Sequence, residues 1–292
     1  MAFLYKCVYI KSGDNGIFVC VGEKGKSYYS TDGETWIEMT GLFSSKYNSV
    51  AYGSGILLCV GRMGSVFHSQ DYKAWFNPLE MAESTEYYCV TYGNEKFVIV
   101  GDNGYTYYSC NGKELVKMTG TARVRLLGVA YGNGKFICVG FYGKSYCSVD
   151  GETWVEMTGL PFGTTYNGVT YGDDRFVCVG ESGKTHYSLD GETWVEMTGS
   201  GSSTLNSVTY GNDRFVCVGN SGVSYYSKDG ETWVGMTGLS NETSYNGVTY
   251  GNGRFVCVGN GKTHYSLDGE TWVEMTGNQT ESLQSVCYFE KI

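Results

Sequence analysis

Short apolar runs alternate with polar, glycine-rich turns along almost the whole chain. In one representative stretch, turns of Gly, Asp, Ser and Glu separate apolar and aromatic segments at residues 167–171, 175–179, 184–188 and 193–197. Runs of about five residues that are rich in aromatic and β-branched side chains, and bounded by turn residues, predict β-strands. Four such strands joined by short turns predict an antiparallel, up-and-down sheet.

This unit repeats every 39 or 40 residues, as the string S-x-D-G-E-T-W shows. The string begins at five positions, and altered copies begin at two more: Ser30, Ser148, Ser188, Ser227 and Ser266, then Ser69 and Ser109. A repeat of about 40 to 50 residues with four strands is typical of a β-propeller, in which each sheet buries its faces against its neighbours. We therefore expect an all-β chain that forms a single seven-bladed β-propeller of four-stranded antiparallel blades.

The repeat also predicts the blade boundaries. The blades cover approximately residues 1–41, 42–81, 82–120, 121–159, 160–198, 199–237 and 238–277, followed by a closing strand within 278–292. Residues 285–288 match the first-strand pattern V-x-Y, and so do residues 7–9, which gives eight candidates for seven blades. We expect the C-terminal strand to join the N-terminal blade and close the ring. The pattern leaves open which terminal strand lies innermost.

The charge of the chain narrows the choice of partner. Its net charge is −9, which disfavours nucleic acids and anionic membranes, because both are bound by basic surfaces. No apolar run approaches the roughly 20 residues that a membrane-spanning helix needs. The N-terminal sequence M-A-F-L-Y-K lacks the long apolar core of a signal peptide. We therefore expect neither a nucleic-acid partner nor membrane insertion.

The cysteines follow the repeat rather than a disulfide framework. Six of the 11 share one position of the second strand, where the third blade carries Ile99: Cys20, Cys59, Cys138, Cys178, Cys217 and Cys257. A position that accepts Cys or Ile is a small buried apolar site, so we expect reduced thiols and folding in the cytoplasm. No C-x-x-C pair occurs and the three histidines are scattered, so we predict no metal and no cofactor.

The S-x-D-G-x-T-W string resembles the Asp-box, the repeated motif of sialidase-type and related β-propellers. The repeats are also similar to those of bacterial and phage surface proteins, including tail-associated receptor binders, which implies a possible place in a virion. The turn chemistry favours structural roles, because an Asp in a turn accepts backbone hydrogen bonds and a Trp can be buried between blades. We assign these roles to ten residues: Asp32, Trp36, Asp150, Trp154, Asp190, Trp194, Asp229, Trp233, Asp268 and Trp272.

An enzymatic function would need more than these turns. The sialidase resemblance implies three clustered arginines, a tyrosine nucleophile with an acidic partner, and an acid/base aspartate. Here Arg175, Arg214 and Arg254 share one repeat position, so they lie on successive blades instead of converging. A glycosidase needs two carboxylates at a set separation, and nothing in the sequence singles out such a pair, although a one-off acid such as Asp102 or Glu80 could still act. We therefore predict no catalytic residues.

Topology indicates where a ligand would bind. In a four-stranded antiparallel blade, the first and third turns lie at one end, and the second turns lie with the blade-to-blade connections at the other. The first end repeats almost unchanged (the constant face), whereas the second differs in nearly every blade (the variable face). Function often resides in such loops, although exposed loops also diverge without function. Our candidate binding residues are three aromatic residues and then four others: Phe141, Tyr142 and Phe162, followed by Arg62, Met63, Arg123 and Arg125.

One further set of residues faces the same end. It occupies the middle of the third strands: Tyr28, Tyr107, Tyr146, His186, Tyr225 and His264. Strand alternation predicts that these side chains face solvent, although a ring of them with nearby lysines could also bind sugars. Taken together, the sequence favours a non-catalytic binding or scaffold module that recognises a protein or a glycan through the variable face. Two alternatives stay open: a glycoside hydrolase of the sialidase type, and a structural component of a phage virion or larger assembly.

Overall fold

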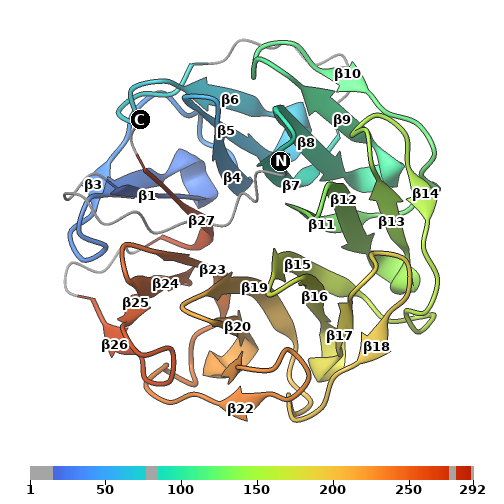
Figure 1. Ribbon diagram of the computed structural model, residues 1–292. Coiled ribbons are helices and arrows are strands. Elements are labelled where there is room, and N and C mark those ends of the chain that lie inside the picture. Colours follow the sequence, from blue (N-terminus) through green and yellow to red (C-terminus); the bar gives the residue numbers. More distant parts are fainter. Residues whose placement is uncertain (1–15, 77–84, 276–280, 291–292) are drawn as a thin grey trace.

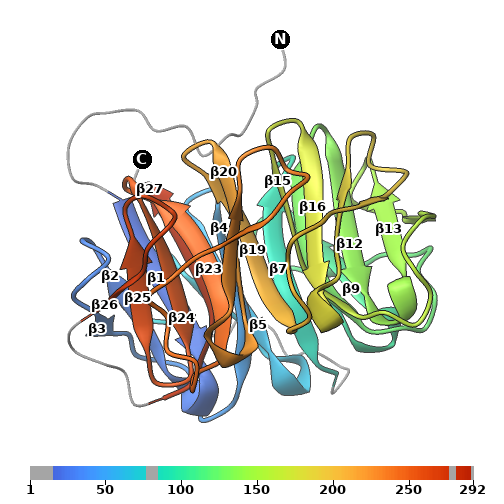
Figure 2. The same cartoon turned by 90° about the horizontal axis from the view of Figure 1, so that it is seen from below.

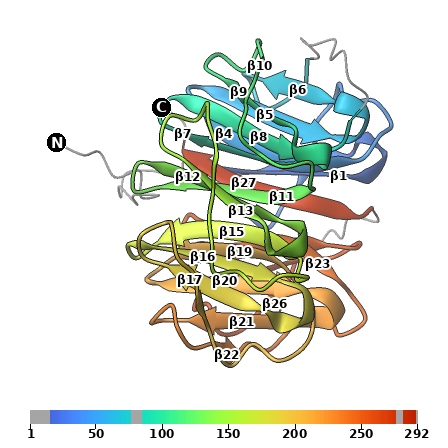
Figure 3. The same cartoon turned by 90° about the vertical axis from the view of Figure 1, so that its right-hand side faces the viewer.

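The computed structural model describes residues 16–76, 85–275 and 281–290 of the chain. It is an all-β protein in which seven blades surround a central channel, as predicted (Figure 1). Viewed from the side, the blades stand next to one another with their strands running from one face of the ring to the other (Figures 2 and 3). The short 3-10 turns gather at the lower edge in Figure 2, which is the variable face.

Each blade is an antiparallel sheet whose strands are ordered outward from the channel. The innermost strands are β4 (Tyr47–Gly53), β7 (Tyr87–Gly93), β11 (Leu126–Gly132), β15 (Tyr166–Gly172), β19 (Leu205–Gly211), β23 (Tyr245–Gly251) and β27 (Leu283–Glu290). The second strands are β5 (Ile56–Gly61), β8 (Lys96–Gly101), β12 (Lys135–Gly140), β16 (Arg175–Gly180), β20 (Arg214–Gly219), β24 (Arg254–Gly259) and β1 (Gly16–Gly22).

The outer strands are shorter than the inner ones. The third strands are β6 (Val66–Ser69), β9 (Thr106–Ser109), β13 (Ser145–Ser148), β17 (Thr185–Ser188), β21 (Ser224–Ser227), β25 (Thr263–Ser266) and β2 (Ser27–Ser30). The fourth strands are two residues long: β3 (Ile37–Glu38), β10 (Val116–Lys117), β14 (Val155–Glu156), β18 (Val195–Glu196), β22 (Val234–Gly235) and β26 (Val273–Glu274). In the described part of blade 2, a single bridge between His68 and Phe76 takes the place of the fourth strand.

The C-terminal strand closes the ring. Strand β27 pairs antiparallel with β1, from Gly16 opposite Glu290 to Gly22 opposite Leu283, and it is the innermost strand of that blade. The structure therefore bears out the expected docking and answers which strand lies innermost (Figure 1). The N-terminal candidate strand at residues 7–9, and also Glu80, lie outside the described residues.

The hydrophobic core lies between neighbouring blades. The six second-strand cysteines are completely buried, and burial raises the pKa of thiols such as Cys178 well above the usual value. All ten cysteines within the described ranges are free. Across those same ranges, the structure contains no helix of the length and apolar character needed to cross a membrane.

The third-strand prediction was wrong. Tyr146, His186 and His264 are at most 3% exposed, and Tyr28 and Tyr107 are each 7% exposed, while Tyr225 is partly buried. The reason is that both faces of a propeller blade pack against neighbouring blades. Alternation along a strand therefore selects between two buried faces rather than between core and solvent.

The S-x-D-G-x-T-W turns fasten the blades on the constant face. Oδ1 of Asp190 accepts hydrogen bonds from the backbone N–H groups of Glu192 and Thr193 at 2.7 and 2.8 Å. Trp194, which follows, is 7% exposed, and its Nε1 donates to Oγ of Ser145 in the preceding blade at 3.3 Å. The same turn in blade 1 lowers the pKa of Asp32 to about 2, because the backbone N–H bonds of Thr35 and Glu34 outweigh desolvation.

Candidate binding surface at the variable face

Hydrogen bonds between loops define the variable face. Its 3-10 turns are η1 (Glu23–Gly25), η2 (Arg62–Gly64), η3 (Asp102–Gly104), η4 (Phe141–Gly143), η5 (Glu181–Gly183) and η6 (Asn220–Gly222). Each turn contacts the connection that leads into the next blade. For example, N–H of Gly143 donates to the carbonyl of Thr164 at 2.6 Å, and N–H of Gly222 donates to that of Thr243 at 2.8 Å. The turn and the connection therefore form one surface above each blade junction.

At the junction of blades 4 and 5, three aromatic rings form a stack. The rings of Tyr142 and Phe162 lie 6.2 Å apart with planes inclined by 21°, and Phe141 meets Tyr142 edge-on at 6.1 Å. Tyr142 is 57% exposed and Phe162 is 87% exposed, whereas Phe141 is half-buried and packs on the core. The structure thus brings together the three aromatic residues that the sequence singled out.

Tyr142 projects from the surface because of its backbone conformation. It has a φ of 59°, in the left-handed region, and the corresponding position of the other turns carries Lys24, Met63, Asn103, Ser182 and Ser221. A bulky aromatic residue in that region is uncommon in proteins. The turn therefore holds the Tyr142 ring at the face, and none of the other five turns η1 to η6 carries an aromatic residue at this position.

Arg125 extends the aromatic stack toward the channel. Its guanidinium lies over the Phe141 ring, with Cζ 5.4 Å from the ring centroid. Its Nε donates to Oδ1 of Asp102 at 2.9 Å, and this hydrogen bond raises the pKa of Arg125. The arginine is thereby fixed in place between an aromatic ring and a carboxylate.

A second charged pair joins η2 to the residue that directly precedes β7, close in sequence to Tyr88. Nε of Arg62 lies 3.3 Å from Oε1 of Glu86. Burial raises the pKa of Tyr88, the nearby Glu86 carboxylate raises it further, and Arg125 lowers it. Tyr88 lines the channel, and the charges of both arginine–carboxylate pairs act on its hydroxyl.

The remaining predicted residues lie at the edge of this surface. Arg123 is exposed on the connection into blade 4, and in the sequence it follows the Arg62–Glu86 pair and precedes the aromatic stack. Met63 is 75% exposed on η2, two blades away from η4. Phe43, which the sequence analysis did not select, is 67% exposed on the connection into blade 2 and meets Phe67 edge-on at 5.5 Å.

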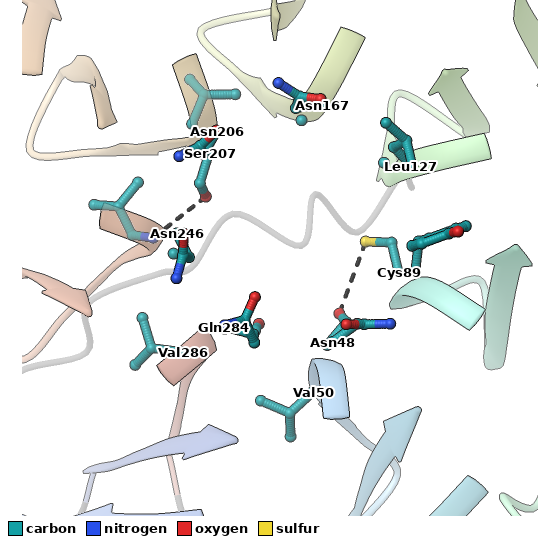
Figure 4. Close-up of a pocket in the computed structure, with 18 of the residues that line it drawn as sticks. Asn48, Val50, Cys89, Leu127, Asn167, Asn206, Ser207, Asn246, Gln284 and Val286 are labelled. Atoms are coloured by element: carbon teal, nitrogen blue, oxygen red, sulfur yellow. Dashed lines mark hydrogen bonds between the residues drawn. The ribbon is translucent and has the colours of Figure 1, made fainter. Parts of the chain in front are cut away.

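The central channel opens at the same face. Its cavity has a volume of ≈ 220 Å³ and is lined by the innermost strands of all seven blades (Figure 4). One position of these strands forms a ring of mostly amide side chains: Asn48, Tyr88, Leu127, Asn167, Asn206, Asn246 and Gln284. The amide ring was not predicted. Its signal in the sequence is the recurrent Asn after the first residue of the inner strand.

Comparisons with solved structures reveal the propeller fold alone. Two structures of YCF48 match with a TM-score of 0.63. One, described as YCF48 bound to D1 peptide, is 17% identical and covers 81% of this chain and 83% of its own. The other, from Cyanidioschyzon merolae, is 14% identical, and the match covers 85% of this chain and 94% of the YCF48 chain. A streptogramin B lyase matches with a TM-score of 0.73 at 8% identity, and the match covers 82% of this chain and 86% of the lyase chain. No protein-family model and no curated protein sequence matches the chain.

The site offers no obvious place for a metal ion. Within the described ranges, no three His, Cys, Asp or Glu side chains are grouped closely enough to hold one. The two histidines of the third strands instead meet tyrosines: Nδ1 of His186 lies 3.0 Å from the hydroxyl of Tyr166, and Nδ1 of His264 lies 3.3 Å from that of Tyr245. These groups are buried between blades, away from the surface assembled above.

Proposed function

We propose that the protein is a non-catalytic binding module that recognises a segment of a partner protein through the variable face of blades 3 to 5. The observation that carries the proposal is the stack of Tyr142 on Phe162, two large rings that remain 57% and 87% exposed. Exposed aromatic rings that are grouped and bordered by polar residues mark interaction sites. Tyr, Phe and Arg are also the residue types enriched in protein interfaces.

The arrangement favours a polypeptide because it places exposed aromatic rings next to arginine side chains. The rings of Tyr142 and Phe162 would cover apolar side chains of the partner, and Arg125 and Arg123 would pair with its acidic or carbonyl groups. Phe141 is anchored in the core and supports the exposed rings from below. The peptide complex of YCF48 supports this reading at the level of the fold only.

Two features support the proposal that the binding module is not an enzyme. The carboxylates of Glu86 and Asp102 at the channel mouth are each engaged by an arginine, at 3.3 and 2.9 Å. A glycosidase needs one of its two carboxyl groups to be protonated and free to reach the substrate, which an arginine partner opposes. In the turn aspartates, such as Asp190, Oδ1 accepts from two backbone N–H groups and Oδ2 accepts from the hydroxyl of Thr193, so both oxygens are already engaged.

Glycan binding and a role in a virion or other assembly rest on the resemblance of the repeats and on the general ability of aromatic rings to stack on sugars. Both would use the same exposed rings. Folding in the cytoplasm fits the buried thiols. We propose the protein partner first, and we treat a glycan as an outcome that the experiment below separates.

The experiment compares wild-type protein with the double variant Tyr142→Ser/Phe162→Asn. These residues already occupy the corresponding positions of blade 6, where Ser221 and Asn241 stand, so the fold is expected to tolerate them. Both proteins are screened against a random peptide library displayed on phage and against a glycan array. We expect wild type to select peptides that the double variant binds at least about tenfold more weakly, since burying aromatic rings at an interface contributes about 1–2 kcal/mol each.

Leu267→Ser is the matched control, because Leu267 is a large apolar residue that is 60% exposed in a turn of the constant face, away from the proposed surface. It is expected to retain the selected peptides. Equal peptide binding by the double variant would contradict the proposed surface. Selective capture of glycans without peptides would replace the protein partner by a carbohydrate, and turnover of a glycoside would overturn the non-catalytic assignment.

A further inference from the structure

The amide side chains at the channel mouth are locked in one orientation. Nδ2 of Asn48 donates to the carbonyl of Tyr87 at 2.8 Å, Nδ2 of Asn206 to that of Tyr245 at 2.9 Å, and Nδ2 of Asn246 to that of Leu283 at 2.9 Å. In each case the carbonyl belongs to the next blade. A backbone carbonyl can only accept, so the NH₂ end of each amide must face it.

The second hydrogen of each of these amides is also used. Nδ2 of Asn48 donates to Oε1 of Glu86 at 3.1 Å. Nδ2 of Asn206 and of Asn246 donate to Oδ1 of Asn220 and Asn260, at 2.9 and 3.3 Å. Since an amide nitrogen carries two hydrogens, all three groups have only their oxygen left to offer. Within the described residues, no hydrogen bond reaches any of these three Oδ1 atoms.

At the seam between blade 7 and blade 1, a chain of hydrogen bonds fixes the orientation of the amide groups in the same way. Nε2 of Gln284 donates to Oγ of Ser282 at 2.8 Å, and Oγ of Ser282 donates to Oδ1 of Asn260 at 2.7 Å. Oδ1 of Asn260 also receives the bond from Asn246. The directions of these bonds support the orientation of Asn246, and they engage the nitrogen end of Gln284.

We propose that this amide ring binds a primary ammonium group, and that the partner supplies it as a lysine side chain or an amino terminus inserted into the channel. An ammonium group carries three donors and no acceptor, which complements the three free amide oxygens of Asn48, Asn206 and Asn246. It is compact, unlike a guanidinium, whose planar donors need acceptors in one plane. A cavity of ≈ 220 Å³ admits a side chain but not a folded element. The net charge of −9 favours a cation.

The inference rests on the proposed function, because the partner that covers the aromatic stack is taken to supply the ammonium group. Arg125 links the two places along the chain: it lies over Phe141 of the stack, and it directly precedes β11, whose Leu127 lines the channel.

The test is a titration of the full chain with n-butylammonium chloride, followed by ¹⁵N NMR of the side-chain amides of Asn48, Asn206 and Asn246. The comparison probes are n-butanol, a neutral molecule of similar shape, and potassium chloride at the same ionic strength. We expect saturable shifts with n-butylammonium, and we expect the two comparison probes to bind at least about tenfold more weakly, because a charge-assisted hydrogen bond is roughly twice as strong as a neutral one.

The matched variant is Asn206→Leu/Asn246→Leu, because blade 4 already carries Leu127 at this position of the ring. Asn48 and the backbone amide of Gly247 report binding in this variant, and its melting temperature shows whether it is folded. We expect at least about a fivefold loss of n-butylammonium affinity from removing two acceptors. If the double variant does not fold, Asn206→Leu alone is used, with a loss of at least about twofold expected.

Several results would overturn the inference: absence of saturation with n-butylammonium, an equal response to n-butanol or potassium, or undiminished affinity in the folded leucine variant. Tyr142→Ser/Phe162→Asn separates this inference from the proposed function, because it removes the aromatic stack and leaves the amide ring intact. Peptide binding that depends on the stack, without ammonium binding at the channel, would overturn this inference alone. Ammonium binding without any stack-dependent partner would contradict the proposed function.

Discussion

The ring of Tyr52 stacks on the ring of Phe289 at a centroid distance of 4.0 Å, with their planes 16° apart. At the other junctions, the equivalent tyrosine of one blade lies against a glycine of the preceding blade. A Cβ added at Gly132, for example, would lie 2.0 Å from Cγ of Tyr171. The closing strand thus replaces a glycine by a phenylalanine, and the junction that completes the ring is an aromatic pair.

Phe289→Ala is expected to destabilise the protein at this seam. Phe289 is 6% exposed and packs in the cluster that joins blade 1 to blade 2, so its loss removes buried area and leaves a cavity. We expect the free energy of unfolding in urea to fall by about 3 kcal/mol. Phe162→Ala removes the same ring from an 87% exposed position and is expected to change stability by less than about 0.5 kcal/mol. Equal effects of the two changes would contradict this account of the seam.

Gly132→Ala is expected to disturb a regular junction. Because the added Cβ would overlap the ring of Tyr171, the blades must separate, and we expect a loss of about 1–3 kcal/mol, measured by thermal unfolding. Gly235→Ala serves as the control, since a Cβ there meets no atom within 4 Å. It is expected to be neutral or slightly stabilising, because alanine restricts the unfolded chain more than glycine does.

His186 and His264 are expected to make stability depend on pH. Burial lowers the pKa of each to about 4, below the 6.5 of the free side chain. As the pH falls, the unfolded chain therefore takes up protons first. The contribution of these two groups to the free energy of unfolding is fully present above about pH 6.5 and is lost between pH 6.5 and pH 4, by up to about 3 kcal/mol for each histidine.

His186→Tyr/His264→Tyr tests this assignment, because blade 3 carries Tyr107 at the same position beside Tyr87, 5.7 Å away. We expect the double variant to keep its melting temperature between pH 6.5 and pH 4.5, where the wild type loses several degrees. A parallel decline in both proteins would show that other groups cause the loss.

Asp190→Ala is expected to weaken the constant-face turn. It removes the acceptor of two backbone hydrogen bonds and releases Trp194 from its fixed approach to blade 4, so we expect a loss of about 1 kcal/mol by urea unfolding. Asp190→Asn is the milder comparison, because Asn111 makes the same two bonds in blade 3, both at 2.9 Å. Peptide binding by the variable face should not change in either variant, and a parallel loss of binding would argue against separate roles for the two faces.

The fold was predictable because its signal is local and repeated. The turn chemistry around Asp190 and the apolar runs before it specify one blade, and the period of the repeat specifies the number of blades. The innermost place of β27 was not predictable in the same way, because both terminal segments match the first-strand pattern and only ring closure distinguishes them. Likewise, His186 was assigned to solvent because alternation within one strand does not reveal the neighbouring blade that covers it.

The candidate surface was predictable only in part. Phe141, Tyr142 and Phe162 stood out because aromatic residues are unusual in exposed turns, and the structure brings them together. The asparagines of the channel did not stand out, because a polar residue on an otherwise apolar strand is what any half-exposed strand shows. Asn48 and Asn206 are 158 residues apart in the sequence, and only closure of the ring places them around one channel.

The position of β27 also bears on how the molecule folds. Its partner β1 lies near the other end of the chain, so the two can pair only after the intervening blades have shortened the distance between them. The entropy lost in joining such distant segments is not repaid until the pairing is complete. We therefore expect the last native contacts to form between β1 and β27, and during synthesis the intervening blades must persist as an open arc until residues 283–290 emerge from the ribosome.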